Sequence, residues 1–216
     1  MLSKNIKILI ISGHGGKDSG AVYGNLIERD MNLICSKALY EELKLNGYHV
    51  DYEWNNGDVH YEYSISHNYD LVISVHFNSG KGDGFECFCN LRNNETVSIC
   101  KHIEKRVIEF GQNSRGIKSG DNLKMVGSVE KNAILLEGGF IDNPKDSSLF
   151  DERHEMIKLG QAYAHGVMDY FGDKPIEKKE GVYRVVVGSY AIKNNALEMQ
   201  RKLKEKGFDS FLVFVE

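Results

Sequence analysis

Several features that define other protein classes are missing from this 216-residue sequence. Its unbroken apolar runs reach only about five residues, whereas a helix that crosses a membrane needs roughly 18. No positively charged start precedes a long apolar segment, so we expect a protein made in the cytoplasm without a signal peptide. Lys and Arg number 27 against 31 Asp and Glu, so the basic excess typical of nucleic-acid-binding proteins is absent. The sequence therefore predicts neither a membrane nor a nucleic-acid partner.

Cysteine and proline are also scarce, with four and two residues. The cysteines form no CxxC pair, which argues against a thiolate zinc site or a thioredoxin motif. We expect them to be small core residues in a reducing compartment. They are Cys35, Cys87, Cys89 and Cys100. Both prolines, Pro144 and Pro175, fall at segment boundaries.

Two common catalytic motifs are absent as well. The glycine-rich stretch GHGGKDSG is no P-loop, because Gly15–Gly20 is followed by Ala21 and Val22 where Lys and Ser or Thr are required. It is no dinucleotide fingerprint either, since the GxGxx spacing from Gly13 meets Asp18. No GxSxG elbow occurs, which argues against a serine hydrolase.

What the sequence contains is enough apolar material, 41% of residues, for a buried core. Helical patterns of apolar residues span 31–39, 100–111 and 156–170, the first stopped by Gly47. They alternate with apolar runs that predict strands, so residues 1–171 should form an α/β domain with a largely buried sheet. The predicted strands are Ile6–Ile11, Tyr48–Glu53, Leu71–Val75, Phe85–Phe88, Leu123–Val126 and Ala133–Leu136.

A second, smaller part follows this domain. Residues 172–181, GDKPIEKKEG, have the composition of a linker. Beyond it the pattern predicts a small C-terminal βαβ domain within residues 182–216. Its strands would be Tyr183–Val187 and Phe211–Val215, and its helix Asn194–Lys206, ended by Gly207.

Three residues capable of chemistry follow the apolar runs directly: His14, His76 and Glu137. Sites in open α/β sheets form outside the carboxyl ends of the strands, so these side chains should share one sheet edge. Glu28 lies at the start of the first helix, whose N-terminus faces the same edge if the helix runs back along its strand. Two imidazoles and a carboxylate suit a catalytic zinc with an open fourth position. Glu137 is the candidate for the free carboxylate that moves the proton.

Each of these residues also has a structural interpretation. A single histidine is more often a packing or surface residue, although the glycines around His14 suggest that something large approaches the backbone there. Glu28 could be a helix-dipole partner. Glu137 follows four apolar residues, so it would be costly to leave unpaired. Surface or packing roles are expected for His49, His60, His67, His102, His154 and His165.

Four blocks in order, GHGGKDSGAVYGNLIERDMN, DLVISVHFNS, SRGIKSGDNLKMV and AILLEGGFIDNPKD, resemble the zinc-dependent N-acetylmuramoyl-L-alanine amidases of the type 3 class. This family includes bacterial autolysins and phage endolysins, and the resemblance spans about residues 5–171. It implies a twisted mixed six-stranded sheet flanked by helices, with Zn2+ bound by His14, Glu28 and His76 and with Glu137 as the catalytic carboxylate. It also implies cleavage of the amide between N-acetylmuramic acid and L-alanine in peptidoglycan.

The family commonly has small residues around the Asn that is Asn78 here, so Phe77 should alter the groove. Asn78 could orient the substrate, but a structural turn role is an equal alternative. Two other functions stay open: a zinc carboxypeptidase, which commonly has an HxxE spacing that His14 and Glu28 lack, and a non-catalytic wall-binding module. Without a signal peptide, the protein would reach the cell wall after release, as a phage endolysin or as an autolysin freed by lysis.

The C-terminal segment, residues 182–216, resembles one half of a SPOR-type peptidoglycan-binding domain, in RVVVGSY and KGFDSFLV. So few residues cannot bury a sufficient core alone. We therefore expect a homodimer joined through residues 182–216, with the two halves completing one wall-binding unit. Packing of this segment on its own catalytic domain is the alternative.

Overall fold

The computed structural model describes residues 5–54, 56–129, 131–176 and 186–214. The chain divides into two compact units, an N-terminal unit of residues 1–176 and a C-terminal unit of residues 177–216.

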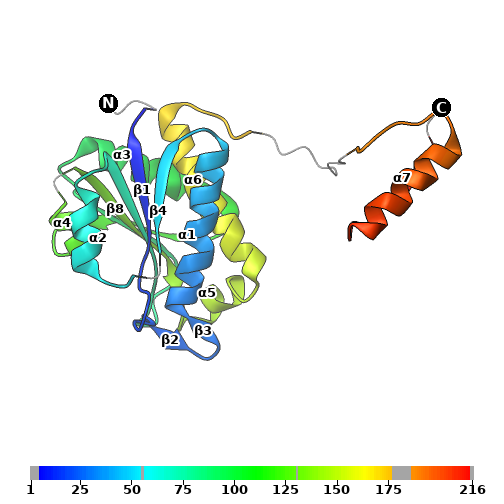
Figure 1. The fold of residues 1–216 in the computed structure, drawn as a ribbon. Helices are drawn as coiled ribbons and strands as arrows, with labels where there is room; N and C mark the ends of the chain where they lie inside the picture. Colours follow the sequence, from blue (N-terminus) through cyan, green and yellow to red (C-terminus); the bar gives the residue numbers. More distant parts are fainter. Residues whose placement is uncertain (1–4, 55, 130, 177–185, 215–216) are drawn as a thin grey trace. The chain divides into compact units, whose positions relative to one another are not determined.

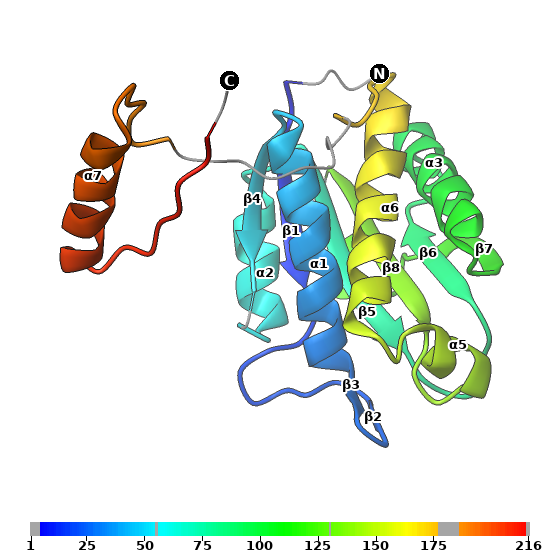
Figure 2. The same ribbon diagram turned by 90° about the vertical axis from the view of Figure 1, so that its right-hand side faces the viewer.

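The N-terminal unit is built on a mixed six-stranded sheet with the order β4-β1-β5-β8-β6-β7 (Figures 1 and 2). All neighbouring strands are parallel except β6 and β8, which are antiparallel. The expected mixed six-stranded sheet is confirmed. Its strands are β1 (Lys7–Ser12), β4 (His49–Glu53), β5 (Leu71–Asn78), β6 (Phe85–Cys89), β7 (Ser114–Ser119) and β8 (Asn132–Phe140).

Helices cover both faces of this sheet. The long helices α1 (Glu28–Leu45), α3 (Asn94–Phe110) and α6 (Arg153–Phe171) lie side by side on one face (Figure 2). On the other face, α2 (Val59–Ser66) and α4 (Lys124–Gly127) cover a smaller apolar cluster that includes Leu9 and Val72 (Figure 1). Completing the unit are the hairpin β2 (Val22–Tyr23) and β3 (Leu26–Ile27) and the short helix α5 (Pro144–Leu149).

Five of the six predicted strands and all three predicted helices of this unit are confirmed, but the run Leu123–Val126 is wrong as a strand. Most of it forms α4, with Met125 and Val126 packed inward. The sixth strand is β7, SRGIKS, which has only one strongly apolar residue. An edge strand pairs on one side only and needs little apolar character, so hydrophobic periodicity misses it.

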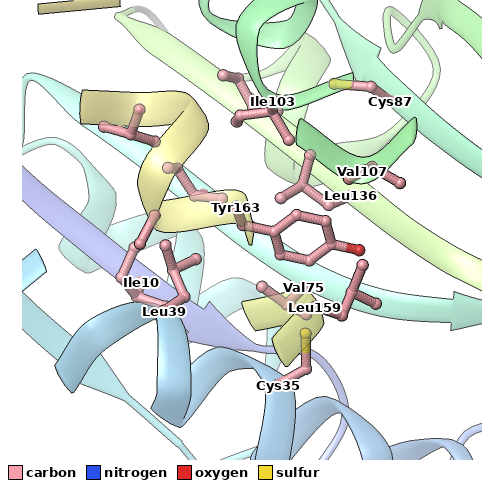
Figure 3. Close-up of a cluster of buried hydrophobic side chains, with 14 of the residues drawn as sticks. Ile10, Cys35, Leu39, Val75, Cys87, Ile103, Val107, Leu136, Leu159 and Tyr163 are labelled. Carbon is pink, nitrogen blue, oxygen red and sulfur yellow. The ribbon is translucent and has the colours of Figure 1, made fainter. Parts of the chain in front are cut away.

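The main core lies between the sheet and the long helices, around the buried Tyr163 of α6 (Figure 3). Two glycines let α6 approach its neighbours closely. A Cβ at Gly160 would lie 2.2 Å from the Cys35 carbonyl oxygen of α1, and one at Gly166 would lie 2.4 Å from the Cα of Ile103 in α3. This contact fixes α1, whose first residue is Glu28. All four cysteines are buried and free, as expected for core residues.

In the C-terminal unit, the predicted helix is confirmed as α7 (Lys193–Glu205). The predicted strands differ: residues 186–187 and 211–214 form no strand, and residues 183–185 and 215 lie outside the described part of the chain. A strand needs a hydrogen-bonding neighbour, which so small a unit does not supply alone. No residue of α7 is buried, and Phe214, Val186 and Phe211 are 89%, 73% and 72% exposed.

The predicted linker, residues 172–181, is described only up to residue 176. Gly172 ends α6 in a left-handed conformation. The next residues bond to the N-terminal unit: Tyr48 donates a hydrogen bond to Asp173 at 2.6 Å, and the Ile176 amide donates to Asn46 at 2.8 Å. This first part of the segment is therefore attached to the sheet domain.

Candidate active site

The structure brings the four predicted residues to the same end of the sheet. His14 follows β1, and Glu28 is the first residue of α1. His76 lies in β5 directly opposite Glu137 of β8 in the parallel register. The site thus joins segments more than 100 residues apart in the sequence through the pairing of adjacent strands.

One carboxylate oxygen lies between the two imidazoles. Oε1 of Glu28 is 3.0 Å from Nε2 of His14 and 3.2 Å from Nδ1 of His76. The ligand atoms that these three residues offer all lie within 4.8 Å of one another. Such a group of two histidine nitrogens and one carboxylate oxygen could hold a metal ion.

The second polar atom of each of these three side chains also has a hydrogen-bonding neighbour. Asp18 lies 2.8 Å from Nδ1 of His14, and the Ser74 hydroxyl lies 3.1 Å from Nε2 of His76. The Ala21 amide donates to Oε2 of Glu28 at 2.9 Å. These contacts fix the rings and leave one atom of each residue facing the others, the arrangement that orients metal ligands.

Asp18 and Ser74, which contact the two rings, were not among the residues predicted from the sequence. Ser74 had a usable signal, because residues two apart in a strand share a face and Ser74 precedes His76 by two. Asp18 had none, since the tight turn that returns it to His14 includes a left-handed backbone at His14, with φ of 63°.

Two glycines make room for the site's own side chains. A Cβ at Gly13 would lie 2.1 Å from the His76 ring, and one at Gly20 would lie 2.6 Å from both Glu28 and His14. The glycine-rich stretch therefore does serve close approach, as expected, and what approaches the backbone is the rest of this cluster.

The electrostatics of the cluster follow from these contacts. The hydrogen bond with Glu28 raises the pKa of His14 to about 9, against the opposing effect of burial. Burial acts to raise the pKa of Glu28, but the hydrogen bonds with both histidines hold it well below its usual value. In the metal-free cluster, the Glu28 anion thus favours a proton on His14 at neutral pH.

Glu137 has a different environment. Burial raises its pKa to about 8, and the negative charges of Glu28 and Glu86 act in the same direction. Its Oε2 atom is buried and has no hydrogen-bond partner among the residues that the structure describes. The side chain is therefore a carboxyl group poised to exchange a proton near neutral pH.

A cavity of about 220 Å³ opens over the two histidines. Besides His14 and His76, its lining includes Glu62 of α2 and Leu135 of β8. Burial raises the pKa of Glu62 to about 7. The sequence did not predict Glu62 as a site residue, because α2 lacks a clear apolar period. Its position over the site depends on how α2 packs against the sheet.

Asn78 lies on the same strand as His76, two residues further along. Its side-chain amide donates a hydrogen bond to Glu86 of β6 at 3.2 Å. The residue therefore borders the site, with its amide nitrogen engaged by a neighbouring strand.

Comparison with known proteins gives two family matches. The model of a family described as N-acetylmuramoyl-L-alanine amidase matches residues 8–169, and that of the SPOR domain matches residues 155–214. No helix in the described ranges has both the length and the apolar character to cross a membrane.

Individual relatives agree with the first match. The sporulation-specific N-acetylmuramoyl-L-alanine amidase of Bacillus subtilis is 27% identical, over 96% of this chain and 84% of its own length. The N-acetylmuramoyl-L-alanine amidase CwlM of Bacillus licheniformis is 26% identical, over 97% of this chain and 85% of its own. Among solved structures, Cwp6 from Clostridium difficile is 28% identical with a TM-score of 0.72, over 78% of this chain and 29% of its own.

Proposed function

Because the chain belongs to the N-acetylmuramoyl-L-alanine amidase family and hydrolyses the amide between N-acetylmuramic acid and L-alanine in peptidoglycan, we propose that it does so with one zinc ion. His14, Glu28 and His76 would hold the ion, and Glu137 would transfer the proton. Membership of this family removes the carboxypeptidase and the non-catalytic module as alternatives.

The donor set supports zinc. Two imidazole nitrogens and one carboxylate oxygen are the ligands of many catalytic zinc sites, and family members are generally zinc-dependent. Zinc in such a site supplies Lewis acidity, which activates water near neutral pH and polarises a carbonyl group. Asp18 and Ser74 would keep the two rings oriented toward it.

Glu137 is suited to the proton transfer by its position and its protonation. It lies beside His76 in the sheet, and its buried Oε2 has no partner within the described part of the chain. Its carboxylate would take a proton from the attacking water, and its carboxyl form would deliver that proton to the nitrogen of the leaving alanine.

The observation that carries this proposal is the single Glu28 oxygen within 3.2 Å of both imidazoles. Its test is the zinc content of purified His76→Ala, compared with wild type and with His154→Ala, an exposed histidine on α6. We expect about one zinc per chain in wild type and His154→Ala, and loss of most zinc and activity in His76→Ala. Full zinc occupancy in His76→Ala would reject the ligand set.

We also propose that residues 182–216 form half of a SPOR-type wall-binding unit and join two chains into a homodimer. The SPOR match starts within α6, whose Leu159, Tyr163 and Val167 are buried in the sheet domain. Only the later residues are free to form such a unit. Their exposed apolar side chains favour association with a second copy. Two catalytic domains held on one polymer would gain effective concentration.

A further inference from the structure

A second charged cluster lies on the sheet beside the active site. Glu86 of β6 is only 3% exposed. Its Oε1 accepts hydrogen bonds from Nε of Arg115 and Nζ of Lys118, each at 2.5 Å, and its Oε2 accepts the one from Asn78. One buried carboxylate thus holds two cations from β7 in place.

This cluster is continuous with the site. Glu86 lies directly opposite Glu137 in the antiparallel register, and Glu137 lies opposite His76. The charged residues therefore form a strip across β5, β8, β6 and β7 at one end of the sheet. The Arg115 and Lys118 side chains are 41% and 36% exposed, so both cations can be reached from solvent.

The charge of the cluster is not balanced internally, because two cations share one carboxylate. Within the described part of the chain, Arg115 pairs with Glu86 through Nε alone, which leaves the outer fork of the guanidinium available to an acceptor. Such a fork matches the two oxygens of a carboxylate. Aromatic rings flank both cations: Phe140 lies 5.2 Å from Arg115, and Phe88 lies 5.9 Å from Lys118.

The distance from the site suits a peptide. Adjacent strands are about 4.8 Å apart, so Glu86 lies about 10 Å from the His76 strand, a span that two extended residues and a carboxylate carried by the second can cover. The muramic acid carboxyl is consumed in the amide that is cleaved, so a carboxylate reaching this strip belongs to the peptide side of the bond.

We propose that Arg115 and Lys118 form a subsite for a carboxylate of the stem peptide, carried by the residue that follows L-alanine. This subsite selects acidic peptides and places the scissile amide against the active site. Glu86 and Asn78 position the two cations and do not contact the peptide. The inference rests on the proposed function, because it takes the active site to be at His14, Glu28, His76 and Glu137.

The test uses two synthetic muramoyl dipeptides with the same acidic second residue. The carboxyl group at the end of the chain is capped as an amide in both, and the other carboxylate of this residue is either free or converted to a primary amide. Wild type should cleave the free acid about 10- to 100-fold more efficiently in kcat/KM, mainly through KM, as expected for a charge-assisted hydrogen bond. Arg115→Gln should lower kcat/KM on the free acid to about its value on the amide, which removes the preference. Lys118→Met should reduce the preference in the same way. This second variant tests the subsite if Arg115→Gln does not fold.

The matched control is Arg92→Gln, which removes an 80% exposed arginine paired with Asp121. It should keep the wild-type preference. Equal rates on both substrates in wild type, or an unchanged preference in Arg115→Gln and Lys118→Met, would overturn the subsite. Failure of wild type to cleave either substrate while it still degrades intact walls would also overturn the subsite. Failure on walls as well would instead reject the proposed function.

Discussion

Replacement of Glu137 by Gln should have opposite effects on activity and on stability. The change keeps the size of the side chain and removes only its ability to ionise. It spares all three proposed zinc ligands, so the fold and the zinc content should stay at wild-type levels. Activity should fall because no group then moves the proton.

The magnitudes follow from the surroundings of this carboxyl group. Loss of a general acid–base group costs about 10²- to 10⁴-fold in rate. Burial raises the pKa of Glu137 from its usual 4.5 to about 8. Between these two pH values the folded protein keeps a proton on Glu137 that the unfolded chain has already released. Metal-free wild type therefore loses stability as the pH rises from about 4.5 to about 8, by up to about 3 kcal/mol at pH 7. Gln escapes this loss, which corresponds to roughly 6–12 °C in Tm.

Three measurements on one preparation check both effects. Turnover on muramoyl peptides and zinc content are measured in the loaded enzyme. Thermal unfolding is followed after chelation, at pH 4.5 and pH 8. The matched control is Glu42→Gln, which changes another buried carboxyl group, on α1 and 4% exposed. It should keep wild-type turnover and should not raise Tm at pH 8.

Two results would refute this reasoning. Near-wild-type turnover in Glu137→Gln, together with a large loss in Glu62→Gln, would move the proton transfer to Glu62. A Tm difference between wild type and Glu137→Gln that does not grow from pH 4.5 to pH 8 would show that Glu137 is not held in its neutral form.

Three further predictions concern the metal, the product and the assembly. Since the pKa of His14 is raised to about 9 in the metal-free cluster, zinc binding at pH 7 should release about one proton, and affinity should weaken about tenfold per pH unit below 9. Calorimetry in buffers of different ionisation enthalpy measures this, and binding without proton release contradicts it. The product should be a new α-amino group on alanine with no new reducing sugar, by mass spectrometry of digested walls; new reducing ends without amines would reject the amidase chemistry. Light scattering should give a dimer for the full chain and a monomer for residues 1–176, and a monomeric full chain at micromolar concentration would contradict the dimer.

The sequence determined much of the fold because the elements that form the core have strong local patterns. The buried strands β1, β5 and β8 are nearly continuous apolar runs, and α1 and α6 have the helical period of a buried face. The order of strands and helices also placed His14, His76 and Glu137 toward the carboxyl ends of adjacent strands, and the parallel pairing of these strands brings them together.

Tertiary structure alone decided the features whose local pattern is weak or absent. The edge strand β7 is polar, and α4 is short, so neither has a period that a sequence reveals. The second unit has strand-like segments that form no strands in the described residues, because a strand needs neighbours that its own sequence does not contain.

The same division holds for the active site. Residue type and spacing indicated which side chains could bind zinc, since the chemistry of imidazole and carboxylate is local. The positions of Asp18 beside His14 and of Glu62 in the cavity over the two histidines could not be predicted from the sequence. They depend on a left-handed turn at His14 and on the packing of α2 over the sheet, which exist only when distant segments meet.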